Sequence, residues 1–375
     1  MAVFSWGANS HGQLGLGYES ELCMTPQNLD QKSLQFNPNN IRSIKGGGGH
    51  ILVLDNFGQV FSCGWNNRGQ LGLGNLLDTS EHCNKFTQIP NEFFNDSKVH
   101  KIACGWDISG VITLEKNVYV WGSNSFQQLG ICSRMSSITR PLKLTLPRDD
   151  EIPKKITFGL RHCCILTEDN KIYIYGRIRI SEPYAPGLNI SRIPFNKTEI
   201  IKVQTEMKIN SIASGQNHVI ITVENRTRII GLGDNKYGQI NSFDFDNRIK
   251  LATCGWTHNA ILTNNNEIFL WGRNTYGQIG SNNSLKEAYH TPNKLNIPDE
   301  FGVPEKLYLG SEHGLIVTSL GKVLTWGWNE HGNCGNGTTE NLLSPTFIEL
   351  PSPCKVAGTG AGFCFVICED ITDIK

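Results

Sequence analysis

One short signature recurs along the whole chain. An apolar run ends in an aromatic or other apolar residue and a glycine, an asparagine follows in most copies, and a Gly-Gln-Leu-Gly-like element comes next. The segment Trp-Gly-Arg-Asn at 271–274, followed by Gly-Gln-Ile-Gly at 277–280, is typical. The first glycines of the copies stand at positions 7, 64, 122, 176, 233, 272 and 327. Self-similarity at a spacing of about fifty residues indicates a repeat architecture.

A second signature, Gly-x-x-His, interleaves with the first. Two further copies keep Gly105 and Gly358 but place Ile108 and Ala361 at the histidine position. Short apolar runs around Asn/Asp/Gly turns separate the two signatures and are typical of hairpins. Each repeat therefore predicts a four-stranded antiparallel meander, with strands A to D. The complete copies are Gly47 with His50, Gly159 with His162, Gly215 with His218, Gly255 with His258, and Gly310 with His313.

The two ends of the chain complement each other. Residues 356–358 and 363–366 supply strands A and B of a last unit, whereas residues 3–6 supply a strand C with no A or B before it. We therefore predict an all-β, seven-bladed propeller over residues 1–370, closed by both termini in one blade, with a short tail at 371–375. Ring closure protects the sheet edges. Surface loops are expected between blades, at 75–98, 131–153, 178–200 and 281–305.

Composition narrows the classes of partner. Lys plus Arg and Asp plus Glu both number 34, so the net charge is zero and no global field attracts nucleic acid or a membrane. Residues 1–6 already have the pattern of a strand, so we expect no signal or transit peptide. The twelve cysteines form no Cys-x-x-Cys pair, which predicts buried reduced thiols, Cys104 and Cys254 among them, and a cytoplasmic and nuclear location.

The eight tryptophans fall into two groups. Trp6, Trp121, Trp271 and Trp326 precede a signature glycine and are expected in the core. The other four directly follow a signature glycine. Because the A–B and C–D turns of a meander lie at the same end, these four share one face and are expected to trace an arc that binds a partner. The alternative is that each one packs over a neighbouring blade. They are Trp65, Trp106, Trp256 and Trp328.

Polar residues on the same face are expected to form the rim of a binding site, with solvated turn residues as the alternative. The predicted rim consists of Asp107, Glu312, His313, Glu330 and His331.

The remaining polar repeat positions predict structural roles. The asparagines of the first signature are expected to satisfy turn backbone, and the repeat histidines to bond local backbone rather than zinc. No catalytic set, metal site or cofactor site is predicted, so we expect a protein that is not an enzyme. The asparagines are Asn9, Asn66, Asn124, Asn274 and Asn329.

These interleaved signatures resemble the repeats of the regulator-of-chromosome-condensation family, which implies a seven-bladed propeller. Residues 310–314 and 326–335 look like those of two groups in that family, first the fungal α-tubulin suppressor proteins and next the animal secretion-regulating guanine nucleotide exchange factors. Residues 104–107 also look like the fungal group.

Each resemblance implies a partner. The fungal group implies a heterodimer with a small CSL-type zinc protein of diphthamide synthesis, and an indirect role with Elongator in modifying the wobble uridine of tRNA. The animal group implies exchange of guanine nucleotide on a small GTPase. A chromatin or ubiquitin-pathway adaptor is a third possibility, on fold analogy alone.

Overall fold

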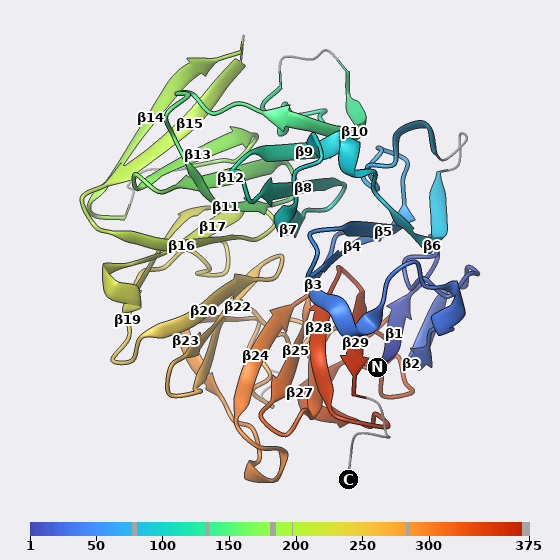
Figure 1. Ribbon diagram of the computed structural model, residues 1–375. Helices are drawn as coiled ribbons and strands as arrows, with labels where there is room; N and C mark the ends of the chain where they lie inside the picture. Colours follow the sequence, from blue (N-terminus) through green and yellow to red (C-terminus); the bar gives the residue numbers. More distant parts are fainter. Residues whose placement is uncertain (77–80, 132–134, 181–184, 197, 283–285, 370–375) are drawn as a thin grey trace.

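Seven antiparallel sheets surround a central axis in the computed structural model (Figure 1). The structure describes residues 1–76, 81–131, 135–180, 185–196, 198–282 and 286–369. The predicted seven-bladed propeller is confirmed. The predicted tail at 371–375 lies outside the described residues.

The blades are numbered from the first complete sheet, and strands are given from the axis outward. Blade 1 is β3 (Ile41–Gly46), β4 (His50–Asp55), β5 (Val60–Trp65) and β6 (His82–Gln88). Blade 2 is β7 (Val99–Cys104), β8 (Ile108–Thr113), β9 (Val118–Ser123) and β10 (Ser137–Leu144). Blade 3 is β11 (Pro153–Phe158), β12 (His162–Thr167), β13 (Lys171–Gly176), β15 (Thr198–Thr205) and β14 (Leu188–Phe195).

The remaining blades follow in chain order. Blade 4 is β16 (Ile209–Ser214), β17 (His218–Val223), β18 (Arg228–Gly233) and β19 (Phe243–Asp244). Blade 5 is β20 (Ile249–Cys254), β21 (His258–Thr263), β22 (Ile268–Arg273) and β23 (Ala288–Leu295). Blade 6 is β24 (Pro304–Leu309), β25 (His313–Thr318), β26 (Val323–Gly327) and β27 (Leu342–Ile348).

Blade 7 closes the ring with strands from both termini, as predicted. It consists of β28 (Cys354–Thr359), β29 (Phe363–Cys368), β1 (Ala2–Ala8) and β2 (Leu22–Asn28). Strand β1 pairs with β29, with Ser5 opposite Phe365. The N-terminal and C-terminal strands lie side by side in Figure 1. Neither β29 nor β1 is left as an edge, which removes a hazard of open sheets.

Blade 3 differs from the prediction. Segment 178–200 was expected to be a surface loop, but β14 and the start of β15 form a hairpin there, which extends outward from the ring (Figure 1). Strand β15 takes the outer position by pairing with β13, with Tyr173 opposite Lys202. The three other predicted loop segments contain the outermost strands β6, β10 and β23.

The Gly-x-x-His signature has a steric cause. A Cβ on Gly47 would lie 2.2 Å from Cε1 of His50, so the imidazole occupies the space that only glycine leaves free. In blade 7 the equivalent pair is Gly360 and Phe363, whose Cζ would lie 2.1 Å from such a Cβ. The predicted register of the seventh copy, Gly358 with Ala361, was therefore wrong because an aromatic ring replaces the histidine.

The first signature joins neighbouring blades. Trp121 is fully buried, and its indole N–H donates to the carbonyl of Gln70 in the preceding blade at 2.8 Å. Asn66 Oδ1 accepts the N–H of Leu71 at 3.1 Å within the same Gly-Gln-Leu-Gly turn. The other predicted core tryptophans, Trp6, Trp271 and Trp326, are also fully buried, which confirms that prediction. The turn role is confirmed in the same way for Asn9, Asn124, Asn274 and Asn329.

Three of the five repeat histidines, His50, His218 and His313, bridge blades through Nε2, which corrects the expectation that they bond local backbone. His50 Nε2 lies 2.8 Å from the Ser109 hydroxyl of blade 2, and His218 Nε2 lies 2.7 Å from Asn259 Oδ1 of blade 5. Burial lowers the pKa of His50 to about 3. The imidazole is therefore neutral in the folded protein at neutral pH.

Candidate functional site

A hollow of about 330 Å³ opens on the face that carries the A–B and C–D turns. Blades 1, 2, 5, 6 and 7 contribute to its lining. The prediction that both kinds of turn share one face is confirmed, because tryptophans from both kinds line this hollow. We call it the tryptophan hollow, after Trp65, Trp106, Trp256 and Trp328.

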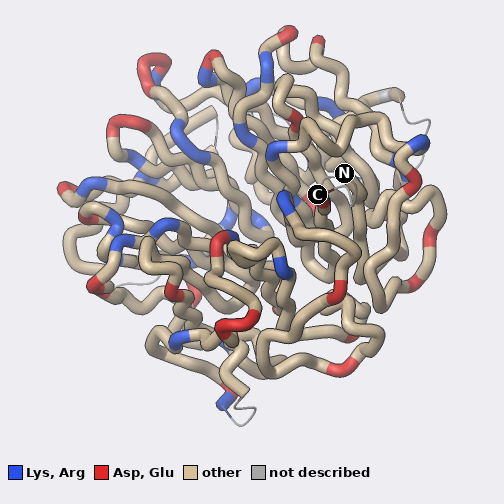
Figure 2. Tube along the Cα trace, turned by 60° about the horizontal axis from the view of Figure 1, so that its bottom comes forward, with Lys and Arg blue, Asp and Glu red and all other residues tan. Residues whose placement is uncertain are grey.

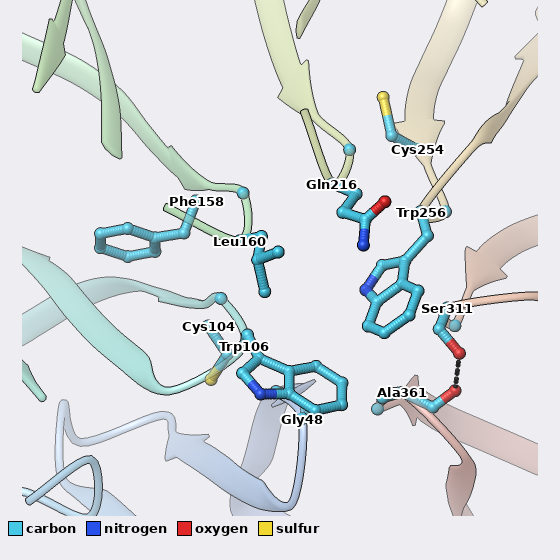
Figure 3. Close-up of a pocket in the computed structure, with 18 of the residues that line it drawn as sticks. Gly48, Cys104, Trp106, Phe158, Leu160, Gln216, Cys254, Trp256, Ser311 and Ala361 are labelled. Carbon is cyan, nitrogen blue, oxygen red and sulfur yellow. Dashed lines mark hydrogen bonds between the residues drawn. The ribbon is translucent and has the colours of Figure 1, made fainter. Parts of the chain in front are cut away.

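Two of these tryptophans meet over the axis of the ring. Trp106 and Trp256 follow the A–B turn glycines Gly105 and Gly255 in blades 2 and 5. Their ring centroids lie 5.0 Å apart at an interplanar angle of 52°. Figure 3 shows the two indoles converging from different sides of the opening. Two of the four tryptophans of the predicted arc are therefore in direct contact. Strand A is innermost in every blade, so its turn reaches the axis and a long side chain there can span the opening.

Backbone hydrogen bonds between blades hold these inner turns. Gly48 N–H donates to the carbonyl of Trp106 at 2.8 Å, and Gln216 N–H donates to that of Trp256 at 2.9 Å. The N–H of Trp256 in turn donates to the carbonyl of Ser311 at 2.7 Å. The backbone of Trp256 is therefore held on both sides and that of Trp106 on the blade 1 side, so a partner would meet a preorganised surface.

The outer part of the hollow pairs tryptophan with histidine. The rings of Trp65 and His11 lie 4.6 Å apart, and those of Trp328 and His331 lie 5.0 Å apart. The indole N–H of Trp328 donates to Glu330 Oε2 at 3.2 Å. His11 was not predicted, although it stands two residues after its signature asparagine, as His331 does. Comparing the seven copies position by position would have found it.

Glu312 is the buried charge of the hollow. It is only 5% exposed, and its carboxylate accepts hydrogen bonds from Gln278 Nε2 at 2.6 Å and Thr257 Oγ1 at 3.2 Å. The Arg273 guanidinium lies 3.6 Å away. Burial raises the pKa of Glu312, opposed by Gln278, Arg273 and Thr257. Glu312 therefore belongs to the wall of the hollow, whereas Glu330 is exposed at its rim.

Two predicted site residues do not line the hollow. His313 is fully buried, with Nε2 3.3 Å from the Cys364 sulfur, and we leave it out of the candidate site. Asp107 is half-buried beside the hollow, where burial raises the pKa of its carboxyl against the opposing effects of Ser123 and Arg68. The other seven predicted residues all line the hollow.

Two cysteines lie next to the inner turns of this face. Cys104 and Cys254 are partly buried, because they pack against the core and also line the axial channel. Burial raises the pKa of Cys104 to about 12, which keeps that thiol protonated and unreactive. Within the described ranges, no group of three or more His, Cys, Asp and Glu side chains is placed to hold a metal ion. No helix in the described part of the chain is long and apolar enough to cross a membrane.

Fold and signatures together define a seven-bladed propeller of the type built from glycine-rich repeats. A family model described as the RCC1-like domain matches residues 2–368, and the chain belongs to this family.

Relatives match the chain over nearly its whole length. The secretion-regulating guanine nucleotide exchange factor of Mus musculus is 30% identical over 403 residues, covering 98% of this chain and 83% of the relative. The ultraviolet-B receptor UVR8 of Arabidopsis thaliana is 28% identical over 364 residues, covering 93% of this chain and 78% of the receptor. Among solved structures, the chain is similar to the crystal structure of Prp20p from Saccharomyces cerevisiae, which is described with its binding to Gsp1p and histones. The TM-score is 0.81 at 22% identity, and the match covers 99% of this chain and 92% of Prp20p. These relatives differ in described function, so family membership establishes the fold and leaves the partner open.

Proposed function

We propose that this chain is a non-catalytic propeller that docks a protein partner in the tryptophan hollow. One observation carries the proposal: four half-buried tryptophans from four blades converge on one cavity. Tryptophan is enriched at binding hot spots, where truncation typically costs about 2 kcal/mol or more. Glu330 and His331 supply a polar rim around the aromatic centre.

Guanine nucleotide exchange on a small GTPase is the finer function that the comparisons support. The relative with the exchange-factor name matches 98% of the chain. An exchange factor of this kind makes and breaks no covalent bond. It needs a rigid surface that binds the nucleotide-free GTPase better than the nucleotide-bound form. The fixed inner turns of the hollow provide such rigidity.

Docking of a small CSL-type zinc protein is the second candidate. The residues that carry the resemblance to the fungal α-tubulin suppressor proteins include Trp106, Glu312 and Trp328, and all three line the tryptophan hollow. On this reading the chain forms a heterodimer that serves diphthamide synthesis and, through Elongator, the modification of wobble uridine.

Both partners can be tested with one set of variants. Trp256→Ala/Trp328→Ala removes one inner and one outer indole from the hollow. The matched control is Phe57→Ala, which removes an aromatic ring that is 58% exposed in the B–C hairpin of blade 1, on the opposite face. The assays are release of fluorescent GDP from small GTPases of the same organism and calorimetric titration with its CSL-type zinc protein.

We expect the wild type and Phe57→Ala to give a signal in one of the two assays. In that assay the double variant should bind its partner more weakly, by about 3 kcal/mol or more in binding free energy. Accelerated GDP release identifies the exchange function, and one-to-one binding of the zinc protein without such release identifies the second candidate. A double variant that binds its partner as tightly as the wild type would remove the tryptophan hollow as the docking site.

A further inference from the structure

A second cavity, of about 630 Å³, occupies the axial channel beyond the inner turns, toward the opposite face. It is lined by the innermost strands of the blades, which surround the axis in Figure 1. A narrower space of about 130 Å³ at the inner turns shares Cys104 and Cys254 with it and separates it from the tryptophan hollow. The two larger cavities therefore present different chemistry at opposite ends of one channel.

Five lysines line the second cavity, and we call it the lysine chamber. They come from the innermost strands of blades 1, 2, 3, 5 and 6. Glu305 is the one acidic residue among the lining residues. Acidic and basic residues are interspersed around the rest of the molecule in Figure 2, in keeping with the net charge of zero. The chamber is thus a local concentration of positive charge. The five are Lys45, Lys101, Lys155, Lys250 and Lys306.

No ion pair among the described residues neutralises these ammonium groups. Lys155 Nζ donates to the Ser211 hydroxyl at 2.8 Å, and Lys101 Nζ donates to the Lys154 carbonyl at 2.7 Å. Both acceptors are uncharged and use one of the three donors that each ammonium carries. Lys45 Nζ makes no hydrogen bond to any part of the chain that the structure describes. Donors and charge are therefore left over in the chamber.

The ammonium groups also repel one another. The Lys45 side chain is exposed to the axial channel. The blades that surround it still exclude enough water for burial to lower its pKa. Burial and then Lys45 lower the pKa of Lys155 to about 8, with Lys101 and Arg226 acting in the same direction. Like charges held together with few carboxylates nearby cost stability, and a bound anion would reduce that cost.

We propose that the lysine chamber binds a compact polyphosphate-bearing small molecule. Lysine binds phosphate as a point charge, and several ammonium groups around one cavity suit an anion with charge on several sides. The volume lies in the range of about 300–1,000 Å³ that is usual for small-molecule sites. A nucleic-acid duplex does not fit inside a chamber of this size, which favours a small anion.

The test uses tripolyphosphate as the probe and compares two lysines of blade 1. Lys45→Gln removes charge from the innermost strand β3, and Lys85→Gln removes the same charge from an exposed position on the outermost strand β6. Tripolyphosphate binding is measured by calorimetry at constant ionic strength, and the melting temperature is measured with and without the probe.

We expect saturable one-to-one binding that raises the melting temperature of the wild type and of Lys85→Gln. Lys45→Gln should bind about tenfold more weakly, because a charge-assisted contact is lost. Without the probe, Lys45→Gln should melt no lower than the wild type, because repulsion is relieved, and this excludes misfolding as the cause. No saturable binding by the wild type would overturn the proposal, as would equal weakening by both substitutions. A short DNA duplex that displaces the probe from all three proteins alike would also overturn it.

Discussion

The indoles of Trp106 and Trp256 lie 5.0 Å apart across the mouth of the axial channel, although 149 residues separate them in the sequence. Each one follows the glycine of an A–B turn, the innermost turn of its blade. The contact therefore links blades 2 and 5, which are not neighbours in the ring. It joins two sides of the propeller at the point where we propose that a partner docks.

This contact should be measurable as a coupling energy. Aromatic pairs contribute about 0.5–1.5 kcal/mol beyond the area they bury. We expect Trp106→Ala and Trp256→Ala to be less costly together than the sum of their separate effects, by about that amount. Urea unfolding of the wild type, both single variants and the double variant gives the coupling directly. Strict additivity would show that the two indoles do not interact in solution.

The buried carboxyl of Glu312 predicts a pH-dependent stability difference. Its pKa is raised in the folded protein, chiefly by burial, so the ionised form is disfavoured and the penalty is present above the raised pKa. The penalty diminishes as pH falls through that pKa and the carboxyl takes up a proton. Glu312→Gln should therefore gain stability relative to the wild type at neutral pH and lose the advantage in acid. Thermal unfolding across pH tests this.

The control for that experiment is Glu330→Gln, which removes an exposed carboxylate from the same hollow. It separates the effect of burial from that of net charge. A stability difference for Glu312→Gln that does not change with pH would contradict the assigned cause.

The buried histidines predict sensitivity to acid. Burial, together with the neighbouring His218, lowers the pKa of His162 from 6.5 to about 3. Between these two pKa values the unfolded chain therefore binds a proton at His162 that the folded chain does not bind. Above the unfolded pKa of 6.5 the neutral imidazole costs no stability. As pH falls from 6.5 toward the folded pKa of about 3, the free energy of unfolding decreases by about 1.4 kcal/mol per pH unit for each such group.

His162→Phe should reduce this sensitivity without disturbing the turn. Blade 7 already carries Phe363 at the equivalent position, with its ring over Gly360 as the imidazole of His162 lies over Gly159. We expect the acid unfolding midpoint to move to lower pH. A midpoint equal to that of the wild type would show that His162 is not protonated on unfolding in this range.

Replacing a signature asparagine should lower the stability of the fold. Asn274 Oδ1 accepts the N–H of Ile279 at 3.0 Å. Asn274→Ala leaves this buried donor without its partner, which should cost about 1–3 kcal/mol. Asn264→Ala, at an exposed asparagine in the B–C hairpin of the same blade, is the control. Equal denaturation midpoints for the two variants would refute the turn role.

Much of the fold could be predicted because the signatures have local causes. The seven aromatic-glycine positions adopt φ between +89° and +111°, a region that glycine tolerates, so the residue type marks the turn. The complementary ends of the chain predicted the closing blade. The β14–β15 hairpin was missed because that copy lacks its Gly-Gln-Leu-Gly tail, and the Pro, Asn and Ser residues of the segment favoured a surface loop.

The candidate site could be predicted only in part. The sequence placed four tryptophans on one face, because meander geometry assigns each turn to one end of a blade. It did not place Trp106 against Trp256, and it gave no sign that Glu312 is buried while Glu330 is exposed. Those facts depend on how far each turn extends toward the axis, and this distance is set by the order of the strands within each blade.

The sequence by itself determined the repeat, the strand pattern, the closing blade and the face on which the unusual tryptophans stand, because each follows from local sterics and chain connectivity. Only the tertiary structure decided that indoles from opposite blades meet, that His11 joins the hollow, and that five lysines converge in one chamber. Ring closure brings together residues far apart in the chain, and their mutual distances are set by the radius of the ring rather than by any local pattern.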